Sequence, residues 1–195
     1  RSLEGVEVAV QGAGNAGAQA ARLVEAHGGK VVALADSHGS LLNPEGIDTS
    51  AVLALKANGA SVHDAVDFGT AGNAEAVISA ACDVLIPAAL EEVITAKNAG
   101  TVMATVVLEV ANGPVTPEAD ELLTARAIGV VPDVLANAGG VTVSYFEWLQ
   151  NRAGEAWTHE RVTERLKDTM RDAYRDVADF AYERGITLRE AAYAL

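Results

Sequence analysis

Three glycines between residues 12 and 17 follow the spacing G-x-G-x-x-G, where a short apolar run gives way to a helical pattern. At these positions Gly12 allows a tight turn, Gly14 lets backbone approach a ligand, and Gly17 lets a helix pack closely on a strand. The N–H groups at the start of that helix, which includes Ala16, favour an anion. The segment therefore predicts a cradle for the pyrophosphate of a dinucleotide; the alternative is a glycine turn with no ligand.

An acidic residue follows the cradle at the spacing expected for a ribose-binding carboxylate. Asp36 lies nineteen residues after Gly17, at the end of the next apolar run, where a carboxylate can accept hydrogen bonds from ribose hydroxyls. Because a carboxylate repels a 2′-phosphate, Asp36 favours NAD as the cofactor. Ser37 and His38 could donate to such a phosphate, so NADP stays open as the alternative, although His38 also fits an exposed turn.

The elements that must position these residues alternate along the chain. A β-branched run at residues 6–11, a helical pattern at 15–27 and a second run at 30–36 predict one βαβ unit with parallel strands. The whole pattern predicts an α/β fold: a Rossmann-like, doubly wound, mostly parallel sheet with helices on both faces. Further strands are expected at residues 84–87, 102–107 and 128–131, and further helices at 50–57, 91–98, 117–126, 141–151 and 158–184, and from 187 onward.

The character of the chain changes after the glycine pair at positions 139 and 140, where only helical patterns follow. We therefore expect a dinucleotide-binding domain over residues 1–151 and a helical C-terminal extension over residues 152–195 that packs on it and is cut short at the end. The long helix has an apolar stripe at spacings of three and four, which marks its packed face. The stripe consists of Val162, Leu166, Met170, Ala173, Val177 and Phe180.

Composition narrows the choice of partners and location. The chain has 195 residues, with 27 acidic and 14 basic side chains and a net charge of -13. This acidic surface repels polyanions, so nucleic acid and anionic membranes are not expected as partners. No apolar run has the roughly 18–20 residues that a membrane span requires. The single cysteine, Cys82, is typical of a reducing compartment, and we expect a cytoplasmic protein.

Five segments resemble the cofactor domain of the glutamate/leucine/phenylalanine/valine dehydrogenases, over essentially the whole chain. They are VQGAGNAG (10–17), ADSHG (35–39), LIPAA (85–89), ANGPVTPEAD (111–120) and VPDVLANAGGVTVSYFEW (131–148). Within that family, NAGGVTVSYFEW looks like the glutamate dehydrogenase version. The resemblance implies an NAD(P)-dependent oxidoreductase that interconverts L-glutamate and 2-oxoglutarate plus ammonia. A leucine, valine or phenylalanine dehydrogenase, and a non-catalytic nucleotide-binding module, remain the alternatives.

The resemblance also implies roles for single residues along the cofactor. Asn15 is expected to donate to the cofactor from the cradle, and Ala88 and Ala89 are expected at a strand end where the sugar passes. Asn112 and Asn137 are expected to hold the nicotinamide ribose and carboxamide. An asparagine suits this task because it offers a donor and an acceptor without charge.

Two residues match the family's contacts to the amino-acid side chain. Ser144 matches the serine that binds the side-chain carboxylate of glutamate, and Val141 is expected to line the same pocket. A hydroxyl there would favour a carboxylate over an apolar side chain. The alternative for Ser144 is an ordinary helix serine bonded to the preceding turn. Val110 departs from the family, which usually has glycine before Ala-Asn, and it adds bulk beside Asn112.

The resemblance implies that the catalytic lysine and aspartate belong to a preceding, substrate-binding domain that this sequence lacks. We therefore expect no catalytic residue in this chain, and Asp133 is interpreted as structural. The histidines have no metal-ligand spacing, so no metal is expected. The parent enzyme is expected to be a homo-oligomer, a hexamer. The isolated chain is expected to bind dinucleotide weakly and not to turn over glutamate.

Overall fold

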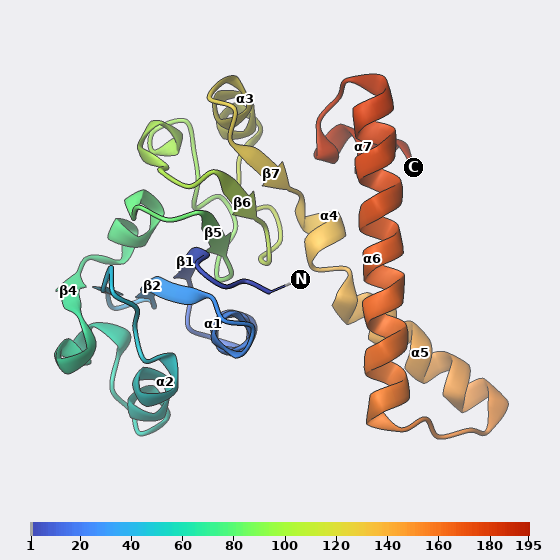
Figure 1. The fold of residues 1–195 in the computed structure, drawn as a ribbon, viewed down its shortest axis with the longest axis horizontal. Coiled ribbons are helices and arrows are strands. Elements are labelled where there is room, and N and C mark those ends of the chain that lie inside the picture. Colours follow the sequence, from blue (N-terminus) through green and yellow to red (C-terminus); the bar gives the residue numbers. More distant parts are fainter. Residues whose placement is uncertain (1) are drawn as a thin grey trace. The chain divides into compact units, whose positions relative to one another are not determined.

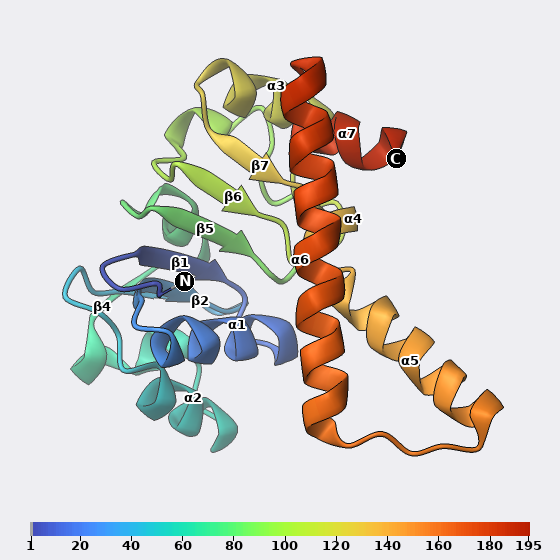
Figure 2. The same ribbon diagram turned by 45° about the vertical axis from the view of Figure 1, so that its right-hand side comes forward.

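Seven strands form one sheet in the computed structural model, which describes residues 2–195 (Figure 1). The spatial order is β4-β3-β2-β1-β5-β6-β7, and β1, β5, β6 and β7 lie side by side in Figure 2. β1 pairs in parallel with β2 and β5, and β5 pairs in parallel with β6, whereas β3 is antiparallel to both β2 and β4. The strands are β1 Glu7–Gln11, β2 Lys30–Ala35, β3 Ser40–Leu42, β4 Thr70–Gly72, β5 Val84–Pro87, β6 Val106–Leu108 and β7 Gly129–Val131. The predicted mostly parallel α/β sheet is confirmed.

Helices cover both faces of this sheet because side chains alternate along β1. Val8 and Val10 pack into a cluster with residues of α1 (Asn15–Ala26) and α2 (Thr49–Ala57). Ala9 points to the opposite face, into a cluster with the 3-10 helix η3 (Ala74–Ser79) and α3 (Pro117–Ala125). Three shorter 3-10 helices complete this part of the chain: η1 Val62–Asp64, η2 Val66–Phe68 and η4 Ala99–Thr101.

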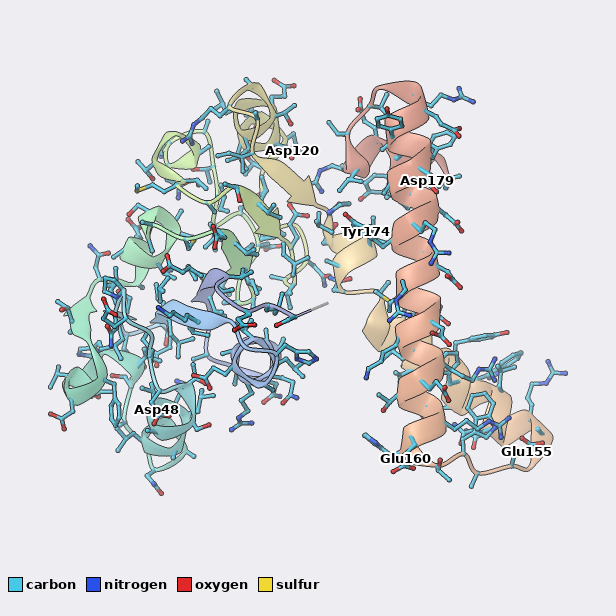
Figure 3. All side chains as sticks on the ribbon, in the orientation of Figure 1. Asp48, Asp120, Glu155, Glu160, Tyr174 and Asp179 are labelled. Carbon is cyan, nitrogen blue, oxygen red and sulfur yellow. The ribbon has the colours of Figure 1, made fainter. Side chains whose placement is uncertain are left out.

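Side-chain caps fix where several helices begin. The Thr116 side chain accepts a hydrogen bond from the N–H of Ala119, and Pro117 occupies the first turn of α3, as expected for a helix start. Asp48 caps α2 by accepting from the N–H of Ala51, and Figure 3 shows Asp48 at the start of that helix. These local signals explain why helix starts were predictable to within a residue or two.

The helix expected over residues 91–98 is wrong. The segment is instead an irregular loop in which Glu92 has a positive φ of 52°. Ile94 is fully buried and forms an isolated parallel bridge with Val115. The Asn98 side chain accepts from the N–H of Thr95 and donates to the carbonyl of Val93. These contacts satisfy the backbone without a helix, against the helical preference of the local sequence.

Contacts divide the chain into a first unit that ends at Val130 and a second unit, Val131–Leu195, whereas the sequence placed the boundary after residue 151. The second unit is helical, with α4 Asp133–Ala136, α5 Gly139–Ala153, α6 His159–Arg184 and α7 Leu188–Ala194. Its buried cluster holds Val177 and Ala181 of α6. Thr158 caps α6, and Gly185 ends it at a φ of 64°. Glu155 and Glu160 lie at the corner between α5 and α6 (Figure 3).

Within residues 2–195, no helix combines the length and the apolarity needed to cross a membrane.

Candidate functional site

The glycine segment forms a tight connection between β1 and α1. Gly12 has a φ of 105°, and its N–H donates to the carbonyl of Ala35 at 3.0 Å. A Cβ on Gly12 would lie 2.7 Å from the Cβ of Ala89, and a Cβ on Gly17 would lie 1.8 Å from the carbonyl oxygen of Gly12. A Cβ on Gly14 would meet no atom within 4 Å. Gly12 and Gly17 therefore serve close packing, and Gly14 leaves open space above the turn.

The start of α1 presents donors to this open space. Gly14 is the N-cap residue and has no side chain with which to cap the helix, and Asn15 and Ala16 are exposed. The first N–H groups of a helix have no acceptor inside it, and the helix dipole adds partial positive charge there. An anionic group fits these donors, and a pyrophosphate is a group of that kind.

A pocket of about 590 Å³ adjoins the cradle, between α1 and α2. It joins the start of α1 to the last turn of α2, two segments separated by some forty residues of sequence. Two of its side chains, Arg22 and Lys56, are cationic. The lining residues are Ala13, Gly14, Asn15, Ala18, Gln19, Arg22, Leu53, Lys56 and Ala57.

Asp36 lies directly after β2, beside this pocket, and its carboxylate is already engaged. One oxygen, Oδ1, accepts from the backbone N–H of His38 at 2.9 Å. The other, Oδ2, accepts from the Lys56 ammonium at 2.7 Å and from the N–H of Val62 at 3.0 Å. The Asp36 side chain is only 5% exposed. Ser37 follows it as an exposed residue of the turn.

These contacts determine the charge of Asp36. Burial raises the pKa of the carboxyl, but the Lys56 ammonium and the two backbone donors outweigh burial and hold the pKa below its usual value. Asp36 is therefore an anion near neutral pH, and Lys56 neutralises it at contact distance.

The ends of β5 and β6 complete the same edge of the sheet. The N–H of Ala88 donates to the carbonyl of Gln11 at 2.7 Å, and the N–H of Ala111 donates to the carbonyl of Pro87 at 2.9 Å. Ala89 lies against Gly12, and Asn112 is exposed in the turn that follows. Because the carboxyl ends of parallel strands meet at one edge, the structure brings residues 12–17, 36, 88, 89 and 112 to that edge.

The remaining predicted site residues lie in the second unit. Asn137 is half-buried at the end of α4, and its carbonyl accepts from the N–H of Gly140 at 3.2 Å. Val141 and Ser144 stand one turn apart on α5; Val141 is 70% exposed, and Ser144 is exposed too. The Ser144 hydroxyl donates to the carbonyl of Gly140 at 3.3 Å, which is the ordinary bond of a helix serine.

Three residues near the cradle escaped the sequence analysis. Lys56 and Arg22 line the pocket between α1 and α2, but nothing in the sequence marks two positions so far apart as neighbours. The Gln11 side-chain oxygen is buried with no hydrogen-bond partner in the described residues 2–195. Gln11 also lines a second pocket, of about 480 Å³, with Ile78 of η3 and Val93. Its position directly before Gly12 is the one signal that could have singled it out.

Metal-ligating side chains form no cluster in the part of the chain that the structure describes. Across residues 2–195, the structure brings together no group of three or more His, Cys, Asp or Glu side chains that could hold a metal ion.

The chain is similar to known proteins over its whole length. A family model described as Glutamate/Leucine/Phenylalanine/Valine dehydrogenase matches residues 1–195. NADP-specific glutamate dehydrogenase A1 of Halobacterium salinarum is 48% identical over 196 residues, which cover 100% of this chain and 47% of that protein. NAD-specific glutamate dehydrogenase A of the same organism is 47% identical over 191 residues, covering 98% and 43%.

The chain is also similar to a solved structure over nearly its whole length. The hetero-hexameric glutamate dehydrogenase from Thermus thermophilus (Leu bound form) has a TM-score of 0.90 at 36% identity, covering 98% of this chain and 45% of that chain. The chain thus spans a little under half the length of the relatives it matches.

Proposed function

The chain belongs to the glutamate/leucine/phenylalanine/valine dehydrogenase family, and on this premise we propose that it is the cofactor-binding half of a glutamate dehydrogenase. The reaction is the interconversion of L-glutamate and 2-oxoglutarate plus ammonia. When bound, the nicotinamide dinucleotide supplies the hydride acceptor or donor. The observation that carries the proposal is the cradle, in which an open Gly14 and an uncapped helix start face a pocket.

In this proposal the cradle binds the pyrophosphate through backbone donors. The N–H groups of Asn15, Ala16 and Gly17 point at the anion, and Gly14 allows it to approach because no side chain stands in the way. The fit is local, since the chain as a whole has a net charge of -13 and repels an anionic cofactor at long range. Binding therefore depends on short-range hydrogen bonds rather than on the overall field.

We assign the nicotinamide end to the two asparagines implied by the resemblance. Asn112 is exposed in the turn after β6, at the same sheet edge as the cradle. The amide of an asparagine both donates and accepts, so Asn112 and Asn137 suit the ribose hydroxyls and the carboxamide. In that role they orient the ring, and Ala88 and Ala89 leave room for the sugar.

Substrate choice is assigned to α5. The Ser144 hydroxyl now bonds to the Gly140 carbonyl, and a hydroxyl can rotate to donate to a carboxylate instead. Val141 is exposed one turn earlier on α5, and we assign it the apolar side of the glutamate-binding site. A serine at this position would favour glutamate over leucine, valine or phenylalanine, because an apolar side chain leaves the hydroxyl without a partner.

The rest of the enzyme is proposed from the relatives. Their additional length would supply a substrate-binding domain with the catalytic lysine and aspartate, so the chain alone would not catalyse the reaction. A Thermus relative is named as hetero-hexameric, and we propose a hexamer of like subunits here. A cytoplasmic location fits a single cysteine, Cys82, that forms no disulfide.

The test is Ser144→Ala in the full-length enzyme, with reduction of NAD or NADP followed at 340 nm. The proposal predicts that kcat/KM for glutamate falls by roughly 10-fold to 100-fold, as expected for loss of a hydrogen bond to a charged group. Thr142→Ala is the matched control, because Thr142 makes the same kind of bond, to the carbonyl of Ala138. Unchanged specificity for glutamate over leucine in Ser144→Ala would contradict the proposal.

A further inference from the structure

We propose that Trp157 is a positioning residue that sets the rotation of α5 and thereby places the Ser144 hydroxyl for the side-chain carboxylate of glutamate. The inference rests on the proposed function, in which Ser144 determines the choice of substrate. Trp157 lies in the loop between α5 and α6, and it acts through α5 rather than on the substrate itself.

The first step is the relation between the two faces of α5. Phe146 is buried, with 3% of its surface exposed, whereas Val141 and Ser144 are exposed. Phe146 follows Ser144 by two positions, so the two side chains point roughly 200° apart around a helix of 3.6 residues per turn. A rotation of α5 that displaces Phe146 therefore displaces the Ser144 hydroxyl as well. Whatever fixes Phe146 fixes the position of Ser144.

The second step is the contact that fixes Phe146. The rings of Phe146 and Trp157 have centroids 5.7 Å apart and are tilted by 48°. The guanidinium of Arg165, on α6, lies over both rings, 4.5 Å from Trp157 and 5.2 Å from Phe146. The guanidinium of Arg161 lies 4.4 Å from the Trp157 ring. Trp157 thus links the buried residue of α5 to two arginines of α6 through aromatic and cation–π contacts.

The third step is how Trp157 itself is held. Its backbone N–H donates to the side-chain oxygen of Gln150, whose amide nitrogen donates to the carbonyl of Phe146 at 3.2 Å. Its indole N–H donates to the Glu155 carboxylate at 3.1 Å, and Arg161 lies 3.8 Å from the same carboxylate. Trp157 is half-buried. Hydrogen bonds to both the backbone and the ring therefore fix its orientation.

The fourth step is why α5 needs this second attachment. At its start α5 packs closely on α6, since a Cβ on Gly139 would lie 3.8 Å from Leu166 and 4.0 Å from the sulfur of Met170. Its far end stands away from α6, and a loop joins the two helices (Figure 2). One contact at the start leaves α5 free to turn about its own axis. The contact at Phe146 sets that turn, and Ser144 lies between the two attachments.

Trp157→Ala in the full-length enzyme, assayed at 340 nm, tests the inference. We expect KM for glutamate to rise by about 3-fold to 10-fold with kcat within about twofold, because the hydroxyl is misplaced and binds a part of the substrate that does not react. Trp157→Phe keeps a ring against Phe146 and should recover most of the wild-type KM. Tyr182→Ala is the matched control: it removes a 90% exposed ring from α6 and should leave KM unchanged.

A double-mutant cycle shows whether Trp157 acts through Ser144. In a Ser144→Ala background there is no hydroxyl to misplace, so adding Trp157→Ala should change KM by less than about twofold. Additive losses would overturn the inference, because Trp157 would then act independently of Ser144. A lower Tm with a wild-type KM in Trp157→Ala would also overturn it, because Trp157 would then only stabilise the fold.

Arg165→Gln tests the same link if Trp157→Ala does not fold, because the Arg165 side chain is exposed and both rings remain. We expect KM for glutamate to rise about 2-fold to 3-fold, and an unchanged KM would overturn the inference.

The two proposals fail in different ways. If Ser144→Ala loses the preference for glutamate over leucine and KM is unchanged in Trp157→Ala, only this inference fails. If Ser144→Ala keeps that preference, the proposed role of Ser144 fails, and this inference fails with it.

Discussion

At the scale of single residues, the three glycines of the cradle do different physical work. Gly17 is buried where a Cβ would lie 1.8 Å from a backbone oxygen, and Gly14 is exposed with no atom near its Cβ position. The spacing of the motif predicted this division, since each position corresponds to one requirement of a strand-turn-helix connection. A substitution at Gly17 should therefore affect stability, and a substitution at Gly14 should affect cofactor binding.

Gly17→Ala is expected to destabilise the fold, and Gly14→Ala is expected to weaken binding. A forced Cβ at residue 17 costs about 1–3 kcal/mol of unfolding free energy, or roughly 2–4 °C in Tm for each kcal/mol. Gly14 has a φ of -81°, which alanine tolerates, so Gly14→Ala should keep the wild-type Tm. It should still weaken NADH binding by roughly 10-fold, because its methyl group occupies the space of the pyrophosphate. Calorimetric melting and an NADH titration check both; the opposite assignment would contradict this account.

Cys82 should be an unreactive thiol. Burial raises its pKa to about 11, with the nearby Asp83 and Glu7 carboxylates adding to the effect and a backbone hydrogen bond from Ala9 opposing it. The thiolate is the reactive form, and at pH 8 only a very small fraction of Cys82 is ionised to it, so the side chain reacts slowly. Native protein at pH 8 should take up iodoacetamide far more slowly than protein unfolded in guanidinium. Mass spectrometry of both samples measures this, and equal labelling would refute the buried environment.

At the scale of elements, the sequence predicted the helix ends and strands that depend only on residues close together in the chain. The cap at Thr116, the glycine at residue 185 and the β-branched runs of β1 and β2 each act within a few residues of sequence. The 91–98 segment escaped prediction because its structure depends on the bridge between Ile94 and Val115, twenty-one residues apart. The strands β3 and β4 have three residues each, too few for a periodic pattern.

The candidate site shows the same limit. The glycine positions and Asp36 were predictable because one βαβ unit fixes their spacing. The contact between Lys56 and Asp36 spans twenty residues and depends on how α2 packs beside α1. The sequence therefore predicted an acid that favours NAD, whereas the structure shows that acid already neutralised by a lysine. Contacts that arise only from packing escape a sequence pattern.

At the scale of the whole molecule, we propose that the chain is a cofactor-binding half without catalytic residues of its own. Its sheet presents a cradle at one edge, and it spans 47% of the length of a relative that is named as a glutamate dehydrogenase. In so acidic a chain, the proposal assigns the anion to the short-range backbone donors of the cradle. The chain should therefore bind the cofactor without turning over glutamate.

The most direct measurement is a titration of this 195-residue chain with NADH and NADPH, followed by an assay at 340 nm with glutamate and the oxidised cofactors. Circular dichroism first establishes that the chain is folded. We expect saturable binding of a reduced dinucleotide, weakened by Gly14→Ala, and no glutamate-dependent reduction. A folded chain that binds neither dinucleotide, or one that oxidises glutamate by itself, would contradict it.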